Sequence, residues 1–434
     1  MKKKIAIRKL LIPSILLVVG VAIGVGITVG GMKGAVTGQQ QTINKHHEFL
    51  KEIFDLILEN HWEKLTEQQL SELYGKALEK ISGSLQPKPP QNWEDVQKIV
   101  DGLGNNLDDS QKTQLAAELS NMVLANLKPF GRSGLFGKKQ EEQLKNTVSN
   151  INPESDLYET IGVEKNTSKE SLDKTYEEQV AILAEETKTS TAAAAKLEKI
   201  KYAYEVLADD QSREIYDTYG AEPTVFSRLL TDNVYYMKIT KISPSTFEEI
   251  KRAAEKSGAG SKPSELIIDV RGNIGGAIDT LAFILGPFIG NNQYAYEFFH
   301  QGEYTPYKTR VGWLDGLVKF DKVVLLTDSQ AQSSAEVITA TFKKYNVGTV
   351  VGTTTKGWGT IEKVFKLKSE LATSQGYSVF LVHSLTVGEN GQPIEGNGVA
   401  PHIDVANSNW KQQLAKKTGS TQLVTEVEKL LSIK

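Results

Sequence analysis

The spacing of hydrophobic positions changes along the chain. Within residues 44–84 and 94–150, hydrophobic side chains recur every three or four residues, which predicts amphipathic helices. The prolines of LQPKPPQNW (85–93) separate these stretches, because proline cannot continue a helix. A Gly-rich segment, FGRSGLFGKK (130–139), interrupts the second one. We therefore expect an all-α region over residues 33–150.

Residues 151–220 predict a second, smaller all-α unit. Thr167 followed by Glu170 fits a capping box that would open its first long helix. Two further helices follow, and the last is expected to stop at Gly220, because glycine commonly ends helices.

From residue 222 onward, short hydrophobic runs alternate with helical patterns. Such alternation is typical of an α/β domain. We expect this core over residues 221–410, followed by a C-terminal helix over 411–434. The expected strands are 233–240, 265–270, 322–328, 347–352, 361–367 and 377–385, and the expected helices are 244–258 and 333–346.

The N-terminus carries one long apolar segment. Residues 10–32 contain no charged side chain, and a helix of this length crosses a bilayer. The tail 1–9 holds five basic residues, so the positive-inside rule predicts a cytoplasmic tail and an extracytoplasmic main body. A cleaved signal peptide is the alternative, although its apolar core is usually shorter. Small-residue spacing permits this helix to form a homodimer; the glycines concerned are Gly20, Gly24, Gly26 and Gly30.

Composition excludes several classes of function. The first forty residues hold six basic and no acidic residues, which leaves 44 basic against 53 acidic residues in the remainder. An acidic body gives no support to nucleic-acid binding. The chain has no cysteine, so thiolate nucleophiles and Cys-ligated zinc are excluded. Neither an HExxH zinc motif nor a P-loop occurs, and we expect no metal and no organic cofactor.

The segment LIIDVRGNIGG (266–276) joins a buried strand to a Gly-rich loop. Glycines allow backbone N–H groups to turn toward a ligand such as an oxyanion. An ordinary turn between a strand and a helix explains the same residues equally well, and both interpretations stay open.

Ser333 lies between a strand and a helix in VVLLTDSQAQSSAE (323–336). A hydroxyl at a helix N-terminus is favourably placed for a nucleophile, because the helix dipole stabilises developing negative charge. Alternatively, Ser333 is a plain N-cap with Glu336 completing a capping box, and the local sequence favours this simpler interpretation.

A serine nucleophile needs a base. None of the six histidines lies in a motif that recommends it. A lysine can replace histidine where its surroundings favour the neutral amine. This directs attention to Lys356 in GTTTKGWGTIE (352–362).

Together, these segments resemble the C-terminal processing, or tail-specific, serine peptidases. The resemblance covers about residues 222–405 and rests on four segments in the family's order: LIIDVRGNIGG, LLTDSQAQSSAE, VVGTTTKGWGTIE and GNGVAPHIDV. Residues 48–90 also resemble the helical N-terminal region of that family. The resemblance implies a crotonase-like (ClpP-like) α/β core and a Ser–Lys dyad that hydrolyses polypeptides.

Carried over to this chain, the resemblance makes Ser333 the nucleophile, three residues before Glu336. It implies that the oxyanion is stabilised by backbone N–H groups near Gly272 or Gly275 and by that of Ser334.

The base position departs from the family pattern. The family's lysine falls on Trp358 and its downstream glutamine on Glu362. An indole cannot accept the serine proton. Side chains two residues apart in an extended chain face the same way, so Lys356 is a candidate for a displaced base. A catalytically inactive pseudopeptidase, with Trp358 filling the former cleft, is the alternative.

Between the helical region and the core, where the family usually carries a peptide-binding PDZ domain, residues 156–220 resemble a J domain. The matching pieces are DLYETIGVEKNTSKESLDKTYEEQ and KLEKIKYAYEVLADDQSREIYDTYG. A J domain needs His-Pro-Asp to stimulate its chaperone partner, and here Ala184, Glu185 and Glu186 occupy those positions. A membrane-tethered co-chaperone is therefore disfavoured, and we expect this unit to pack against or gate the cleft.

The sequence thus predicts a membrane-anchored, extracytoplasmic serine peptidase-like protein that takes a polypeptide as its substrate. The second hypothesis is a non-catalytic peptide-binding or scaffold protein with the same fold.

Overall fold

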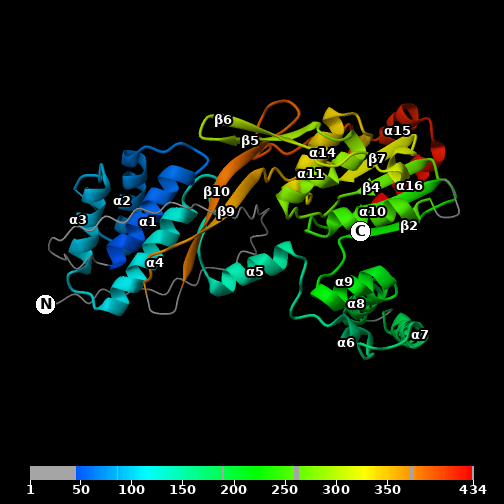
Figure 1. Ribbon diagram of the computed structural model, residues 1–434, viewed down its shortest axis with the longest axis horizontal. Coiled ribbons are helices and arrows are strands. Elements are labelled where there is room, and N and C mark those ends of the chain that lie inside the picture. Colours follow the sequence, from blue (N-terminus) through cyan, green and yellow to red (C-terminus); the bar gives the residue numbers. More distant parts are fainter. Residues whose placement is uncertain (1–44, 86, 188–189, 259–262, 372–375, 433–434) are drawn as a thin grey trace.

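The protein is described by a computed structural model that covers residues 45–85, 87–187, 190–258, 263–371 and 376–432. A helical region lies at one end, an α/β core at the other, and a small helical unit beside the core (Figure 1). The predicted transmembrane segment 10–32 lies outside the described residues. Within the part that the structure describes, no helix is both long enough and apolar enough to cross a bilayer.

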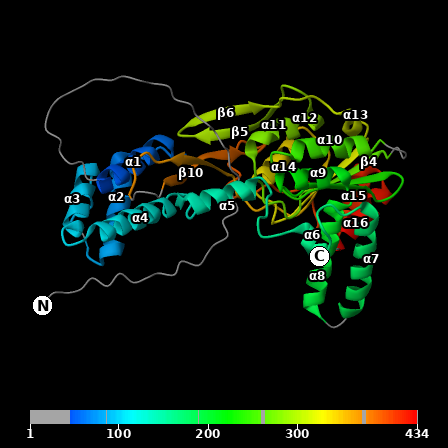
Figure 2. The same ribbon diagram turned by 60° about the horizontal axis from the view of Figure 1, so that its bottom comes forward.

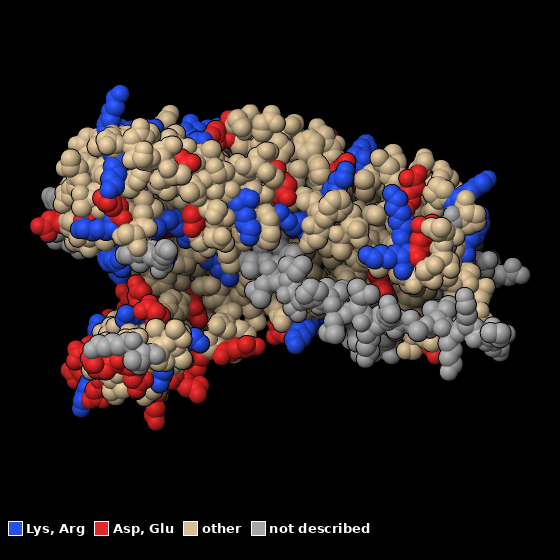
Figure 3. Space-filling view, turned by 180° about the vertical axis from the view of Figure 1, so that it is seen from behind, with Lys and Arg blue, Asp and Glu red and all other residues tan. Residues whose placement is uncertain are grey.

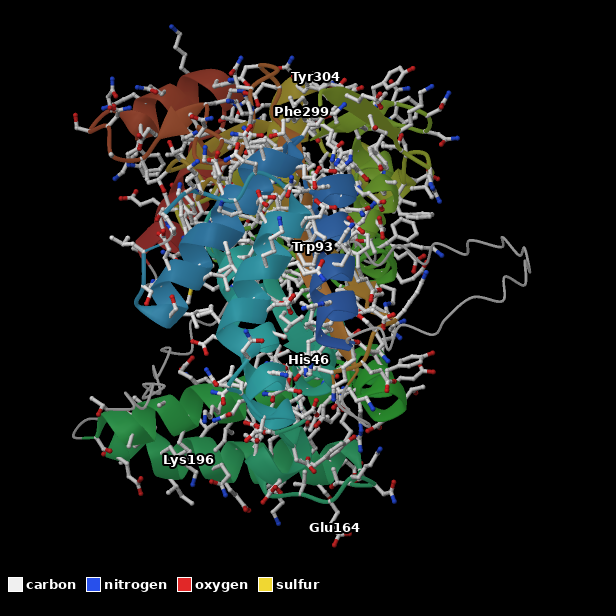
Figure 4. The ribbon with its side chains drawn as sticks, turned by 90° about the vertical axis from the view of Figure 1, so that its left-hand side faces the viewer. His46, Trp93, Glu164, Lys196, Phe299 and Tyr304 are labelled. Carbon is white, nitrogen blue, oxygen red and sulfur yellow. The ribbon has the colours of Figure 1, made fainter. Side chains whose placement is uncertain are left out.

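Among the described residues, the predicted helices of the N-terminal region include α1 (Lys45–Asn60), α2 (Glu67–Ser82), α3 (Trp93–Gly104) and α4 (Asp109–Ala125). Their apolar faces meet around Phe49, Phe54, Tyr74 and Trp93, which are all buried. Figure 4 shows Trp93 among these helices, with Phe299 and Tyr304 near the top of the view.

A five-stranded sheet connects the helical region to the core. It contains β1 (Gly134–Gly137), β5 (Tyr294–His300), β6 (Glu303–Lys308), β9 (Thr360–Lys366) and β10 (Tyr377–Val387). Val379 and Leu381 of β10 pack into the core of the helical region, and Leu385 pairs with Phe299 of β5. The strand β10 therefore belongs to both parts. After β1 the chain continues into α5 (Lys138–Val148).

A six-stranded sheet forms the centre of the α/β core, in the order β11-β8-β7-β4-β3-β2. All neighbouring strands are parallel except β2, which is antiparallel to β3. The strands are β2 (Val225–Leu229), β3 (Val234–Ile239), β4 (Glu265–Asp269), β7 (Lys322–Thr327), β8 (Thr349–Gly352) and β11 (Ile403–Asp404). The predicted α/β core is thereby confirmed, and its assignment to the crotonase-like folds stays a prediction.

Helices cover both faces of this sheet. Side chains from alternate strand positions, such as Ile268 and Ile267, enter two different buried clusters. One face carries α10 (Thr246–Lys256), η1 (Ile278–Thr280), α11 (Leu281–Ile284), α12 (Gly286–Ile289), α13 (Asp315–Val318) and α14 (Ser334–Lys344). The other face carries α15 (Trp410–Thr418) and α16 (Thr421–Ser432). The single C-terminal helix expected over 411–434 is wrong, because Gly419 with φ 66° ends α15.

The small unit contains α6 (Leu157–Ile161), α7 (Lys169–Glu186), α8 (Thr191–Leu207) and α9 (Asp210–Tyr219). Figure 2 shows α7 and α8 side by side as a hairpin. Gly220 ends α9 with φ 65°, as predicted. The N-cap of α7 is Ser168 rather than Thr167, because the Ser168 hydroxyl reaches the N–H of Ser171.

The chain enters and leaves this unit at neighbouring points. Ile151 and Ala221 form an antiparallel bridge, and the N–H of Glu222 donates to the carbonyl of Asn150 at 2.9 Å. An ion pair of 2.5 Å between Asp209 and Lys256 fastens the unit to the core. Its surface is rich in acidic side chains (lower left in Figure 3).

Candidate active site

Three loops follow the carboxyl ends of three adjacent parallel strands. Residues 270–277 follow β4, residues 328–333 follow β7, and residues 353–359 follow β8. Because β4, β7 and β8 are neighbours in a parallel sheet, their carboxyl ends lie at one edge, which is where open α/β sheets bind ligands. The predicted nucleophile, Gly-rich loop and base segment are thus brought together.

Ser333 has a strained backbone. Its φ of 55° with ψ of −122° lies outside the regions that side-chain-bearing residues normally occupy. Strain of this kind persists only where the surroundings fix it, and it occurs preferentially at functional sites. The N–H of Ser333 donates to Glu336 Oε2 at 2.9 Å, which is one such restraint.

The Ser333 hydroxyl does not cap the helix that follows it. The N–H of Glu336 donates to the carbonyl oxygen of Ser333 at 2.8 Å, and the hydroxyl makes no capping hydrogen bond. The hydroxyl is buried and has no hydrogen-bond partner among the described residues. A buried polar group without a partner is costly, so its retention points toward reactivity or ligand binding rather than capping.

The Glu336 carboxylate links Ser333 to residues 353–359, the segment that contains Lys356 and is called the base segment below. Its carboxylate is fully buried and accepts four hydrogen bonds, from the N–H of Ser333, the Thr355 hydroxyl (2.6 Å), and the N–H groups of Gly357 and Trp358 (both 2.7 Å). Burial raises the pKa of Glu336, and these four donors oppose the rise. The carboxylate therefore fixes two loops relative to one another.

Gly275 lies against the nucleophile. It adopts φ 84°, and a Cβ atom added there would come within 2.7 Å of the Ser333 Cβ. Only glycine satisfies both the conformation and the close approach at this position.

Two of the three predicted oxyanion donors are already hydrogen-bonded. The N–H of Gly272 donates to Asp328 Oδ1 at 3.0 Å, and that of Gly275 donates to Asn273 Oδ1 at 2.8 Å. Ser334 is the first residue of α14, so its N–H has no partner within the helix. Of the three, the Ser334 N–H is the one that donates to no acceptor among the described residues.

Among the described residues, no base forms a hydrogen bond with the Ser333 hydroxyl. Lys356 is exposed, and its Nζ lies 4.0 Å from the ring centroid of the half-buried Trp358. The backbone of Lys356 is tied to the nucleophile loop by a 2.9 Å hydrogen bond from its N–H to the carbonyl of Ala331. The Lys356 side chain thus stacks on the indole while its backbone adjoins the loop that carries Ser333.

Glu362 is fully buried in β9. Neither of its carboxyl oxygens accepts a hydrogen bond of normal geometry from the described residues. Burial raises the pKa of Glu362 to about 8, although Thr360 and Arg132 oppose the rise. At neutral pH the carboxyl is therefore largely protonated, and it approximates the neutral glutamine that the family has at this position.

Arg132 is a site residue that the sequence did not reveal. It precedes β1, yet its buried guanidinium donates to the Thr360 hydroxyl at 2.9 Å and to Glu395 Oε1 at 3.1 Å. The guanidinium carbon also lies 4.0 Å from the ring centroid of Trp358. Because Thr360 and Glu395 follow Arg132 by more than 200 residues, no local pattern could have indicated these contacts.

Two parts of the chain match known protein families. Residues 233–405 match Peptidase family S41, and residues 156–217 match the DnaJ domain. The resemblance to the tail-specific peptidases and the J-like insert are thereby confirmed.

Two curated relatives are chaperone proteins. The chain is 44% identical over 69 residues to chaperone protein DnaJ of Geobacillus stearothermophilus, a match that covers 16% of this chain and 18% of the relative. It is 31% identical over 99 residues to the chloroplastic chaperone protein dnaJ A7B of Oryza sativa subsp. japonica, covering 22% of each. The chain thus spans less than a quarter of the length of these relatives.

Solved structures resemble most of the chain at low sequence identity. The photosystem II D1 C-terminal processing protease aligns over 84% of this chain and 94% of its own, with a TM-score of 0.50 and 12% identity. A lipoprotein from Streptococcus agalactiae aligns over 89% and 100%, with a TM-score of 0.42 and 14% identity. The likeness to the D1 protease concerns the fold.

Proposed function

We propose, from the match of residues 233–405 to Peptidase family S41, that this chain is a membrane-anchored serine peptidase that acts on polypeptides outside the cytoplasm. Ser333 is the nucleophile and Lys356 is the base. The described conformation is the resting one, in which Lys356 lies on Trp358. The enzyme becomes active when the Lys356 amine leaves the indole and reaches Ser333.

One observation carries this proposal: the Ser333 hydroxyl is buried without a partner on a backbone held in a strained conformation. Strain and an unsatisfied hydroxyl both reduce stability, so a chain that had no use for this serine would gain from losing them. The Glu336 carboxylate keeps the arrangement in place.

The chemistry follows from the positions of these groups. Ser333 Oγ attacks the peptide carbonyl carbon while its proton passes to the Lys356 Nζ. The N–H of Ser334 stabilises the oxyanion, and the protonated amine then donates the proton to the leaving nitrogen. Water releases the acyl group by the same route in reverse.

A non-catalytic peptide-binding protein is the second candidate. The observation that favours it is Trp358, which occupies the family's base position and holds the amine of Lys356 at its ring. In this case the loops would still bind an extended polypeptide, and Ser333 would have no proton acceptor.

Membrane attachment belongs to the same proposal. It is supported by the uncharged segment 10–32 and the basic tail before it. The glycine spacing in that segment supports a homodimer in the membrane. Carbonate washing of membranes that contain the full chain tests the anchor, since a released protein that starts after about residue 30 would contradict it.

Cleavage of casein and of a C-terminally tailed peptide by the detergent-purified full chain tests catalysis. We expect slow cleavage by the wild type and none by Ser333→Ala or Lys356→Ala. If the folded wild type cleaves neither substrate, the enzyme proposal is wrong. If Lys356→Ala keeps the activity that Ser333→Ala loses, another base is required.

A further inference from the structure

Arg132 reaches from the helical region into the base segment. Its backbone lies between α4 and β1, where the neighbouring Ser133 hydroxyl accepts the N–H of Val382 in β10 at 3.1 Å. The Arg132 side chain is only 9% exposed. A guanidinium this deeply buried must be paired, because an uncompensated buried charge is very costly.

The partners of Arg132 are Trp358, Thr360 and Glu395. It contacts the Trp358 ring and donates to the Thr360 hydroxyl. It also pairs with Glu395, whose other carboxyl oxygen accepts the N–H of Gly359 at 2.8 Å. One guanidinium therefore restrains residues 358, 359 and 360, and a bidentate donor of this shape cannot be replaced by a point charge without loss.

Trp358 is consequently held by residues from two regions of the molecule. Its backbone N–H is bound by Glu336 of the nucleophile helix, and its indole by Arg132 of the helical region. Lys356 lies on the same indole. An aromatic ring that binds a desolvated cation is itself held in place by that contact, so the position of the base depends on Arg132.

We propose that Arg132 is a positioning residue that latches Trp358, and through it Lys356, in the resting position. This inference rests on the proposed function and deepens it. Movement of the helical region against the core withdraws the guanidinium, the indole swings away, and the Lys356 amine is released toward Ser333. Removal of a purely structural ion pair would change only stability. Removal of a latch would also raise the turnover rate.

The test uses the full-length protein with Arg132→Met and Glu395→Gln combined, so that Glu395 is not left as a carboxylate without its cation. The control is Gln301→Ala, which removes hydrogen bonds from Gln301 Nε2 to the carbonyls of Leu58 and His61. That change removes one contact between the same two regions and leaves the contacts of Arg132 with Trp358, Thr360 and Glu395 in place. Arg132→Lys keeps a cation near the ring but not both hydrogen bonds of the guanidinium, and its quenching and labelling are expected to fall between those of the wild type and the double variant.

Two measurements are made on each protein. Acrylamide quenching of Trp358 fluorescence is obtained as the difference between each protein and its Trp358→Phe counterpart. The rate of Ser333 labelling by a fluorophosphonate reports the nucleophile. We expect the double variant to show at least about twofold stronger quenching and about tenfold faster labelling, since a desolvated cation–π contact shifts a population by that order. The Gln301→Ala protein should show neither change.

The outcomes separate the latch from the proposed function. Unchanged quenching in the double variant overturns the latch. If Trp358→Lys accelerates labelling while the double variant does not, the latch is wrong and the peptidase proposal stands. If neither protein labels or cleaves, the peptidase proposal fails, and the quenching result still decides whether Arg132 holds the indole.

Discussion

The N–H of Trp358 donates to Glu336 Oε2 at 2.7 Å, the same carboxyl oxygen that accepts the N–H of Ser333. Two residues that follow different strands of the sheet thus share one buried acceptor. Any displacement of the segment that carries Lys356 alters the restraint on the nucleophile. The positions of Ser333 and of the segment that carries Lys356 therefore depend on one carboxylate. Substitution of Glu336 tests this dependence.

Trp358→Lys is expected to raise peptidase activity. The substitution restores an amine at the family's base position, and the nearby Arg132 guanidinium favours the neutral form that a base requires. A general base typically contributes about 10²–10⁴-fold, and we expect a gain in kcat at the lower end of that range. Casein cleavage measures the gain. Trp358→Phe is the control, and an equal gain in that protein would show that removal of the indole suffices.

Glu336→Gln is expected to abolish labelling of Ser333 and to lower the free energy of unfolding by about 3 kcal/mol. An amide offers one oxygen where the carboxylate offers two, so at least one of its donors loses its acceptor. Urea denaturation and fluorophosphonate labelling measure the two effects.

Glu249→Gln is the matched control for this change, because Glu249 is also a buried carboxylate that accepts backbone N–H groups, from Thr224 and Val225. Labelling that survives in Glu336→Gln, or is lost equally in Glu249→Gln, would contradict a specific role for Glu336.

Glu362 makes stability depend on pH in the neutral range. Its pKa is about 8 in the folded chain and 4.5 ordinarily, so between these values the folded state binds the proton that the unfolded state has lost. Stability is then fully present below pH 4.5 and falls as pH rises toward 8, by an amount on the order of a few kcal/mol. Glu362→Gln should flatten urea-unfolding free energies between pH 5 and pH 8. A slope equal to that of the wild type would exclude Glu362 as its cause.

Gly275→Ala should prevent labelling of Ser333, whereas Gly272→Ala should permit it. Both positions have positive φ, at 84° and 70°, and both variants pay a similar conformational cost of about 1–2 kcal/mol. Only at Gly275 would the new methyl meet the Ser333 Cβ, at 2.7 Å, since nothing lies within 4 Å at Gly272. Equal labelling rates in the two proteins would contradict a close approach of Gly275 to the nucleophile.

Local sequence patterns predicted much of the fold and the order in which the segments of the site occur along the chain. The helices of the small unit, the stop at Gly220 and the strand before Ser333 were all foreseen from capping residues and hydrophobic spacing. These features depend on neighbours within a few residues, which is why one sequence suffices to find them. The J-like unit was recognisable by its resemblance to a known domain.

Long-range contacts were not foreseeable. The strand β1 lies in a Gly-rich stretch that has little intrinsic preference for a strand, and it forms because β10 pairs with it. The stacking of Lys356 on Trp358 and the reach of Arg132 into the core depend on residues brought together by the whole fold. The sequence spacing was compatible with Lys356 facing Ser333. In the structure its amine lies against the indole of Trp358 instead.

The bridge between Ile151 and Ala221 means that the J-like unit begins and ends at almost one point of the remaining structure. An insertion with adjacent ends leaves the host's strand order and packing undisturbed, and for that reason it can be exchanged. Domains of unrelated fold, provided that their own termini lie close together, would fit the same junction. The rest of the chain thus forms a peptidase-like scaffold with one insertion point, at which the acidic helical unit is inserted.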